Sequence, residues 1–465
     1  MIEEVQDTAS EQTTISSRPV TEIFSGVRGI AVKILNRVER TDAYLDKMLD
    51  HEIKQGDFDS SDKALLYELV HGVVRWQGRL DWILAGFYKG QFSKAIPLMK
   101  NALRVALYQI MFLDRIPDYA IVNEAVEFVK KLAGQKPADI SNAVLRNIIR
   151  NKQNLRYPDP NENEIGYLAA YYSHPAWMVK RWLDRFGREE TEQLLASNNE
   201  KPGITLRVNT LKITVEEFKK ELDKQEINFT QSSYMPNYFK LTNLSNITQL
   251  KLFTEGYCTI QDESTGVAVQ SLKPEPGMRV LDMCAAPGGK SAYIAELMEN
   301  KGEVVALDVF STRVAQMQES FDRLGTSIVN SKSMDALEYN DGLFDRVLVD
   351  APCTGMGTLA KKPDIKWKKE ILDIRKMTET QNRLLDKAAD MVKPGGIIVY
   401  STCTTESEEN IQVVNHFLKQ HPNFVLEVNL TEFEQQFANP EGGLQTFPHR
   451  HGMDGAFSAR LIRIN

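Results

Sequence analysis

Two short stretches of the sequence place a cysteine beside polar and glycine residues, just after an apolar run. In "LVDAPCTGMG", Asp350 precedes Cys353 by three positions, and in "YSTCT", Cys403 follows Thr402. A thiolate is a strong nucleophile when its surroundings lower the pKa of the thiol. A neighbouring acid can donate or accept a proton, or hold a substrate by hydrogen bonding. This combination predicts covalent catalysis by a cysteine with Asp350 as its helper.

The alternative is that the cysteines are small buried hydrophobic residues, which is how free cysteines commonly behave. We favour this interpretation for Cys258, and it is plausible for Cys284. It fits Cys353 and Cys403 poorly because both are expected just past strand ends. Four scattered cysteines are also too few for a disulfide framework or a zinc cluster.

A third stretch, "VLDMCAAPGGKS", has the strand, glycine turn and helix start of a nucleotide-binding loop. A phosphate-binding P-loop would need glycine at position 284, where this chain has Cys284, and the G-x-G-x-x-G dinucleotide pattern is absent. Gly288 and Gly289 still allow the backbone to approach a ligand closely. The loop is therefore expected to bind a ligand that carries no phosphate chain.

Acidic residues at successive predicted strand ends complete this ligand site. Asp308 lies twenty positions after Gly288, where a carboxylate can accept both hydroxyls of a ribose. Asp335 follows the next strand and could accept from an adenine amino group, although an acid in this position is often only a helix cap. With Asp282 at the end of the first strand, the set predicts an adenosine ligand such as S-adenosylmethionine.

The elements that position these residues form an alternating pattern. From about residue 277, "RVLDM", "EVVALD", "SIVN", "RVLVD" and "GIIVYS" are expected strands separated by helices, including one around 370–393. This alternation predicts an α/β domain with a parallel doubly wound sheet. Neighbouring parallel strands should bring the loops after 350 and 402 to one pocket at their carboxyl ends.

The rest of the chain divides into three further segments. At 465 residues it is too long for one ordinary core. We predict a disordered tail over 1–20, an all-helical domain over 21–155, linker helices with a small α/β module over 156–275, and the α/β domain over 276–465. No uninterrupted run of apolar residues approaches membrane-spanning length. We therefore expect a cytoplasmic protein.

Basic residues are concentrated locally, although the net charge is −7. One concentration lies in the helical domain and includes Lys130, Lys131, Arg146 and Arg150. A second follows the Cys353 loop and includes Lys361, Lys362 and Lys366, which lie close to Trp367 in the sequence. A solvated charged face is the simple interpretation of each. The place of the second concentration beside the predicted catalytic loop favours RNA binding, in which cations contact phosphates, and the first would extend the RNA-binding surface.

The motifs resemble those of the RNA 5-methylcytosine methyltransferases. "LDMCAAPGGKS", "DAPCTGMG" and "STCT" carry the resemblance, and "RVNT", "QDESTG", "KKPDIKW" and "DGAFSARLIR" are similar to flanking elements. The helical domain, with "LDRIPDYAIVNEAV", resembles the antiterminator NusB, as in bacterial enzymes that act on small-subunit ribosomal RNA. The resemblance implies a Rossmann-like class I methyltransferase domain, preceded by the small α/β module and the NusB-like domain.

The resemblance also implies a role for each matched residue. Cys403 would be the nucleophile that adds to carbon 6 of cytosine, Cys353 would assist product release, and Asp350 would contact the base. The cofactor would be held by Cys284, Ala285, Ala286, Pro287, Gly288, Gly289, Lys290, Asp308, Arg313, Asp335 and Asp350. The segment "SMDAL" around Asp335 departs from the family, which often has a glycine before the acid.

The implied activity is methylation of carbon 5 of a cytosine in 16S ribosomal RNA, naked or in an early assembly intermediate, by a monomer without a metal ion. One alternative is a non-catalytic RNA-binding or antitermination factor, which predicts missing site residues. Another is a methyltransferase acting on a different RNA. A DNA cytosine methyltransferase would use the Pro-Cys thiol, here Cys353, for attack and leave Cys403 without a role.

Overall fold

The computed structural model describes residues 24–41, 43–242 and 247–464, so the tail predicted for 1–20 lies outside the described residues. The chain divides between Thr191 and Glu192 into two compact units, which are considered separately. The finer boundaries at 155 and 275 stay predictions.

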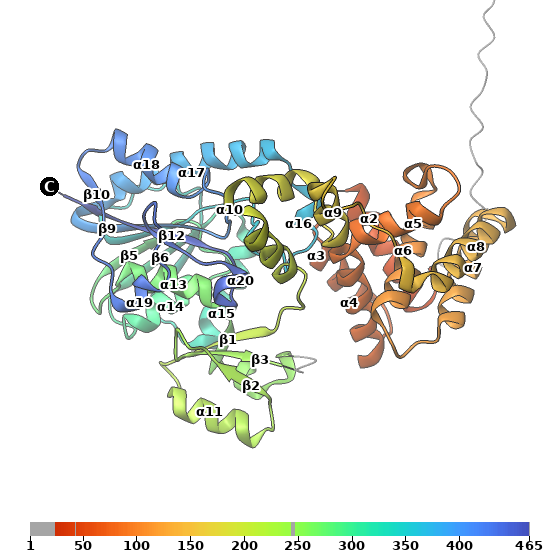
Figure 1. The fold of residues 1–465 in the computed structure, drawn as a ribbon. Coiled ribbons are helices and arrows are strands. Elements are labelled where there is room, and N and C mark those ends of the chain that lie inside the picture. The colour runs from red at the N-terminus through yellow and green to blue at the C-terminus, as the bar shows by residue number, and fades with distance from the viewer. Residues whose placement is uncertain (1–23, 42, 243–246, 465) are drawn as a thin grey trace, which may run out of the picture. The chain divides into compact units, whose positions relative to one another are not determined.

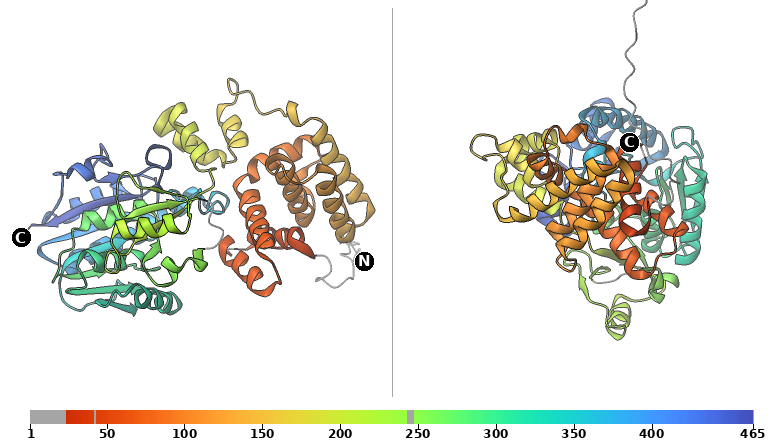
Figure 2. Two further views of the ribbon diagram at one scale, coloured as in Figure 1. Left: turned by 90° about the horizontal axis from the view of Figure 1, so that it is seen from below. Right: turned by 90° about the vertical axis from the view of Figure 1, so that its right-hand side faces the viewer.

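The first unit is helical throughout the residues that the structure describes, as the sequence predicts. Its elements are α2 (Gly26–Arg40), α3 (Leu45–Gln55), α4 (Ser60–Arg75), α5 (Gln77–Phe87), η1 (Phe92–Lys94), α6 (Pro97–Phe112), α7 (Asp118–Ala133), α8 (Gln135–Arg150), η2 (Lys152–Asn154) and α9 (Glu164–Tyr171). Helix α6 is buried along most of its length and packs against α2, α4, α5, α7 and α8. Figure 2 shows these helices from two directions, coloured from red at α2 to yellow at α9.

Helix α7 illustrates how the apolar pattern produces this packing. Ile121, Ala125 and Leu132 recur at helical spacing and are buried. Gly134 follows the last helical residue with a φ of 85°, a left-handed backbone conformation that glycine adopts without strain. The next helix, α8, therefore starts at once and packs against α7. Helix α10 (Ala176–Ser197) spans the division between the two units and breaks at Gly187.

The second unit begins with a small antiparallel sheet. It contains β1 (Ile204–Val208), α11 (Val215–Lys224), β2 (Phe229–Gln231), β3 (Tyr238–Leu241), η3 (Ile247–Gln249), α12 (Lys251–Thr254) and β4 (Cys258–Ile260), with strand order β2-β3-β1-β4. A capping box begins α11, since Thr214 and Glu217 exchange side-chain to backbone hydrogen bonds.

A larger mixed sheet follows, and it carries the motifs. Its elements are α13 (Glu263–Leu272), β5 (Arg279–Asp282), α14 (Gly289–Leu297), β6 (Glu303–Asp308), α15 (Ser311–Leu324), β7 (Val329–Ser333), β8 (Phe344–Asp350), α16 (Ile365–Lys368), α17 (Ile371–Met391), β9 (Val392–Thr402), α18 (Ile411–Gln420), β10 (Phe424–Leu426), α19 (Glu432–Gln435), β11 (Leu444–Gln445), α20 (Pro448–His451) and β12 (Phe457–Arg463). The strand order is β10-β12-β9-β8-β5-β6-β7.

The expectation of a parallel sheet is correct for five strands and wrong for the rest. β7, β6, β5, β8 and β9 are parallel, whereas β12 pairs antiparallel with β9 and also with β10 and β11. The strand β12 returns to the sheet from the end of the chain, and this long-range pairing leaves no local periodic signal.

Helices cover both faces of the large sheet, and each face has its own core. In Figure 1, α17 and α18 lie above the strands and α13, α14 and α15 lie below them. Alternate residues of one strand serve the two cores, because successive side chains point to opposite faces. Val347 and Val349 of β8 pack with the α17 side, and Leu348 packs with the α13 side.

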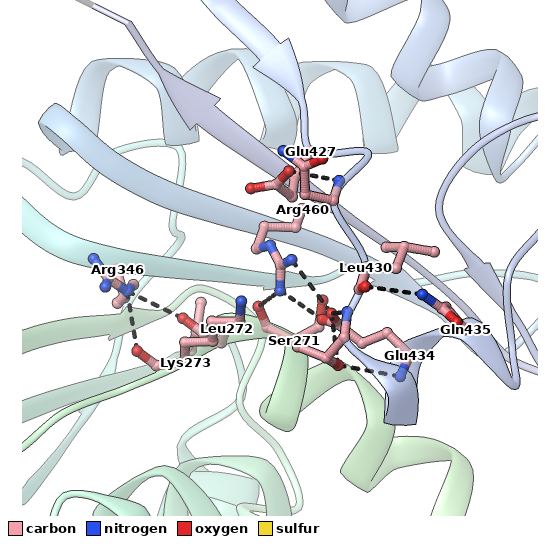
Figure 3. Close-up of polar contacts among 11 residues, drawn as sticks. Ser271, Leu272, Lys273, Arg346, Glu427, Leu430, Glu434, Gln435 and Arg460 are labelled. Atoms are coloured by element: carbon pink, nitrogen blue, oxygen red, sulfur yellow. Dashed lines mark hydrogen bonds and ion pairs between the residues drawn. The ribbon is translucent and has the colours of Figure 1, made fainter.

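Two arginines hold the carboxyl end of α13 against the sheet (Figure 3). Arg460 of β12 donates to the carbonyl of Ser271 at 3.1 Å and forms a buried ion pair with Glu434 at 2.5 Å. Arg346 of β8 donates to the carbonyl oxygens of Leu272 and Lys273. These bonds satisfy carbonyl groups that a helix end leaves without helical partners.

Candidate active site at the carboxyl ends of the strands

The residues selected from the sequence gather at one edge of the large sheet. Asp282, Asp308 and Asp350 are the last residues of β5, β6 and β8. Cys403 directly follows β9, and Cys353 lies three residues beyond β8. Because β5 and β8 are neighbours although four elements of chain (α14, β6, α15 and β7) separate them, the topology reverses between them. Ligands of doubly wound sheets bind at such a reversal.

The two cysteines meet across the neighbouring strands β8 and β9. Their sulfur atoms lie 3.0 Å apart, and the backbone N–H of Cys403 donates to the Cys353 sulfur at 3.3 Å. Both residues are half-buried. The contact confirms that the two neighbouring strands bring both thiols together. Their separate roles stay a prediction.

The surroundings shift the pKa values of the two thiols in opposite directions. The hydrogen bond with Cys353 lowers the pKa of Cys403, and the charges of Lys290 and Lys362 lower it further, against burial and the charge of Asp350. The same bond raises the pKa of Cys353 well above its usual value, and burial and the charge of Glu409 add to this. The lowered pKa of Cys403 favours it as the sulfur that loses its proton first.

Lys290 and Asp350 form an ion pair beside the cysteines. The Lys290 ammonium lies 2.7 Å from Oδ2 of Asp350, and the Ser401 hydroxyl donates to Oδ1 at 2.8 Å. Burial would lower the pKa of Lys290, but the charge of Asp350 and its hydrogen bond raise it overall. The lysine therefore stays protonated near Cys403.

The glycine loop between β5 and α14 has the geometry of a close-approach ligand loop. Gly288 has a φ of 96°, and a Cβ at this position would lie 3.0 Å from the ring of Phe321. Behind the loop, the Ser291 hydroxyl donates to the buried carboxyl of Asp282 at 2.6 Å. Burial raises the pKa of Asp282 to about 7.

The acids expected to hold an adenosine lie beyond the glycine loop. Oδ1 of Asp308 accepts from the backbone N–H of Phe310 at 2.9 Å, and Arg313 lies 3.7 Å from Oδ2. Asp335 is exposed two residues past β7, and its Oδ1 accepts from the backbone N–H of Leu337 at 2.9 Å. That bond caps a turn, so a contact between Asp335 and adenine stays a prediction.

Sequence reasoning missed three exposed apolar side chains in the same region. Val309, Phe310 and Met334 are 55%, 54% and 42% exposed, and each lies within two positions of Asp308 or Asp335 in the sequence. Exposed apolar groups beside a hydrogen-bonding carboxylate suit a flat ring such as adenine. The available signal was the pair of large apolar residues immediately after the strand-end acid in "ALDVF".

The basic residues after the Cys353 loop differ from one another. Lys362 is exposed, and its charge acts on Cys403. Lys361 is held by Asp262 and by Asp454, the latter at 2.9 Å. Lys366 is buried, and its Nζ donates to Oδ1 of Asn199 at 2.8 Å. Trp367 is half-buried. These contacts give Lys361 and Lys366 a structural role, and RNA contact by either stays a prediction.

In the helical unit, Lys130 and Lys131 are exposed at the end of α7, and Arg146 and Arg150 are exposed on α8. The two helices pack against each other.

Within the described parts of the chain, no helix is long and apolar enough to cross a membrane. In the same parts, no cluster of three or more acidic, histidine or cysteine side chains could hold a metal ion.

Comparison with known proteins matches each part of the chain to a described family. Residues 269–462 match the family described as 16S rRNA methyltransferase RsmB/F, and residues 25–150 match the NusB family. Residues 174–248 match a ferredoxin-like domain of RsmF/B-like methyltransferases. The fold class predicted from the sequence is confirmed by these three matches.

Individual relatives cover nearly the whole chain. "Probable ribosomal RNA small subunit methyltransferase B" of Bacillus subtilis is 37% identical over 440 residues, which are 93% of this chain and 98% of the relative. The protein of the same name from Synechocystis is 33% identical, with 93% and 98% covered. A crystal structure described as a methyltransferase homolog from Pyrococcus horikoshii is 30% identical, with a TM-score of 0.57, 65% of this chain and 99% of that chain covered. The chain therefore belongs to the 16S rRNA methyltransferase RsmB/F family.

Proposed function

We propose that this protein methylates carbon 5 of a cytosine in 16S ribosomal RNA through a transient covalent bond from the sulfur of Cys403. Family membership makes the protein an S-adenosylmethionine-dependent rRNA cytosine-C5 methyltransferase. The proposal adds the covalent route and the residue that forms the bond. The observation that carries it is the 3.0 Å contact between the sulfur atoms of Cys353 and Cys403, a hydrogen bond that lowers the pKa of Cys403.

Carbon 5 of cytosine is a poor nucleophile, and the protein has to activate it. The thiolate of Cys403 adds to carbon 6, which makes carbon 5 an enamine-like nucleophile. After carbon 5 is methylated, its proton leaves and the carbon 6–sulfur bond breaks, so the ring regains its double bond and Cys403 its electron pair. Cys353 lies against the departing sulfur and is placed to assist this release.

Asp350 and Lys290 hold the other side of the reaction site. We assign to Asp350 the hydrogen bond with the base edge, because its carboxylate is oriented by Lys290 at 2.7 Å and by Ser401 at 2.8 Å. The Lys290 cation also favours the thiolate of Cys403. An oriented pair of this kind needs little rearrangement when the base arrives.

The cofactor site fits S-adenosylmethionine, which supplies an electrophilic methyl group when it is bound. The Gly288 turn permits close backbone approach, Asp308 offers a carboxylate for ribose hydroxyls, and the exposed Phe310 and its neighbours offer an apolar surface for adenine. The full predicted set is Cys284, Ala285, Ala286, Pro287, Gly288, Gly289, Lys290, Asp308, Arg313, Asp335 and Asp350.

The RNA partner calls for phosphate contacts outside the reaction site. Flipping a base out of its stack costs a few kcal/mol, and cations that hold the backbone offset this cost. We assign this role to Lys362 beside Cys403, and to Lys130, Lys131, Arg146 and Arg150 on the helical unit, all of which are exposed. We further propose that a cytoplasmic monomer acts on naked rRNA or on an early assembly intermediate.

The test separates the two thiols. Cys403→Ser should abolish methylation and leave no adduct, because the weakly acidic hydroxyl does not add to carbon 6. Cys353→Ala should accumulate a covalent RNA complex that survives denaturing electrophoresis. A complex lost in Cys353→Ala and kept in Cys403→Ser would reverse the assignment, as in the DNA enzymes. Bisulfite sequencing of 16S rRNA from a deletion strain identifies the target cytosine.

A further inference from the structure

Glu409 is a fully buried carboxylate that the proposed chemistry does not use. It lies in the loop between β9 and α18 and has no exposed surface. Its Oε2 accepts from the backbone N–H of Thr354 at 2.9 Å and from Nε2 of Gln381 at 3.0 Å. Its Oε1 accepts from the Thr354 hydroxyl. Burying a carboxylate destabilises a protein unless hydrogen bonds of this kind compensate the lost hydration. A role for Glu409 at the two cysteines would explain why a carboxylate is buried here.

The partners of Glu409 are the residues next to the two thiols. Thr354 follows Cys353, and its Oγ1 lies 3.1 Å from Oγ1 of Thr404, which follows Cys403. Gln381 also donates to the carbonyl oxygen of Pro352, the residue before Cys353, at 2.9 Å. One carboxylate therefore anchors the loop after β8 on both sides of its cysteine and, through Thr354, touches the loop after β9.

The strand β9 contributes a further anchor. The Tyr400 hydroxyl donates to the backbone carbonyl of Glu409 at 2.6 Å, which fixes the loop that carries the carboxylate. The Cys353 loop is thus tied to α17 and to the β9–α18 loop by hydrogen bonds that lie out of contact with solvent. Groups held in this way have little freedom to change the distance between the two sulfur atoms.

The charge of Glu409 also acts unequally on the two cysteines. The hydrogen bond with Cys403, burial and the charge of Glu409 raise the pKa of Cys353. The hydrogen bond with Cys353 and the charges of Lys290 and Lys362 lower the pKa of Cys403, whereas burial and the charge of Asp350 raise it. The negative charge behind Cys353 and the positive charges beside Cys403 favour the same assignment of thiol and thiolate.

We propose that Glu409 is a positioning residue that locks the two cysteine loops together and selects Cys403, rather than Cys353, as the thiolate. The inference rests on the proposed function, in which Cys403 is the nucleophile. It deepens that function by naming the group that makes two chemically identical side chains unequal.

Glu409→Gln separates the charge from the hydrogen bonds. The amide oxygen can accept from Thr354 N–H and Gln381, and the amide NH₂ can donate to the Thr354 hydroxyl, which can then donate to Thr404. Glu409→Ala removes both charge and bonds. Thr354→Val removes the hydroxyl link and keeps the carboxylate. Glu408→Gln is the matched control, because it removes one charge from the same loop and leaves the bonds of Glu409 intact.

The readout is limited alkylation with iodoacetamide at several pH values, followed by mass spectrometry of the peptides containing Cys353 and Cys403. In the wild-type protein, label should accumulate on Cys403 first. Glu409→Gln should lower this preference about tenfold, the equivalent of one pKa unit between the thiols. Glu408→Gln should leave it unchanged. Thr354→Val should keep the preference and slow methylation, because the charge remains while the loops lose their link.

An unchanged labelling preference in folded Glu409→Gln would overturn the selection of the thiolate. If that variant does not fold, Thr354→Val tests the proposal instead. A wild-type methylation rate in Thr354→Val would contradict the locking of the two cysteine loops. Labelling needs no RNA or cofactor, so it reports on Glu409 even if the adduct experiment shows that Cys403 is not the nucleophile. The two failures are thereby distinguishable.

Discussion

The ammonium of Lys290 lies 2.7 Å from the carboxylate of Asp350, and this contact joins the helix of the glycine loop to the strand that leads into the cysteine loop. Lys290 belongs to the segment expected to line the cofactor, whereas Asp350 is expected to face the base. The ion pair therefore connects the expected cofactor side of the reaction site with the expected base side.

Lys290→Met is expected to lower the methylation rate by about 10²-fold or more, within the range for losing a positioned catalytic group. The cation lowers the pKa of Cys403 and orients Asp350, so both effects are lost together. Rates with a 16S rRNA fragment and labelled cofactor measure the change. Lys301→Met, at an exposed lysine on the same unit, serves as the control. A wild-type rate in Lys290→Met would contradict this role.

Cys353→Ala is expected to move the pH dependence of Cys403 alkylation to higher pH. The hydrogen bond from Cys353 is the largest cause of the lowered pKa of Cys403, so its loss raises that pKa. In the wild-type protein the reactive thiolate should form at a lower pH than an ordinary cysteine thiolate, because the pKa of Cys403 is lowered. Alkylation rates between pH 6 and pH 10 test the sign, and a shift to lower pH would refute it.

Asp308→Asn and Asp335→Asn should differ in their effect on cofactor binding. The carboxylate of Asp308 is placed for ribose hydroxyls, and losing charge-assisted bonds costs about 1.5–3 kcal/mol, or about 10- to 150-fold in affinity. Asp335 already accepts from Leu337, so its substitution should cost less. Isothermal titration with S-adenosylmethionine measures both affinities. Equal losses of affinity in the two variants would indicate that Asp335 also contacts S-adenosylmethionine directly.

Arg207→Ala is expected to destabilise the second unit by about 3–5 kcal/mol, because it leaves a buried charge without its partner. Arg207 of β1 is fully buried, pairs with Glu296 of α14 and donates to Gln261 at 2.5 Å. The double variant Arg207→Met with Glu296→Leu should recover much of the loss, since it removes both charges. Urea unfolding of the three proteins gives the comparison, and no recovery would point to lost packing instead.

Lys130→Ala with Lys131→Ala should weaken RNA binding and reduce its dependence on salt. Each phosphate contact contributes about one unit to the slope of log affinity against log salt, so the slope should fall by up to about 2. The double variant Lys224→Ala with Lys301→Ala, at exposed lysines elsewhere, should keep the wild-type slope. Filter binding at several salt concentrations measures both. An unchanged slope would exclude phosphate contacts by these two lysines.

Local patterns in the sequence were sufficient to predict the helices of the first unit, the five parallel strands and the acids at their ends. Apolar periodicity, capping residues and glycine turns act within a few residues of the position that they determine, as the apolar stripe of α7 and the capping box of α11 illustrate. The alternation of strands and helices then placed Asp308, Asp350 and Cys403 on one edge of a sheet.

The remaining features depend on contacts between residues far apart in the chain. The antiparallel return of β12 to β9, the burial of Lys366 against Asn199, and the bonds from Glu409 to Thr354 have no local signature. The same is true of the difference between the two cysteines. Their residue type is identical, and only the 3.0 Å contact between their sulfur atoms and the charges packed around each one set which thiol is the more acidic.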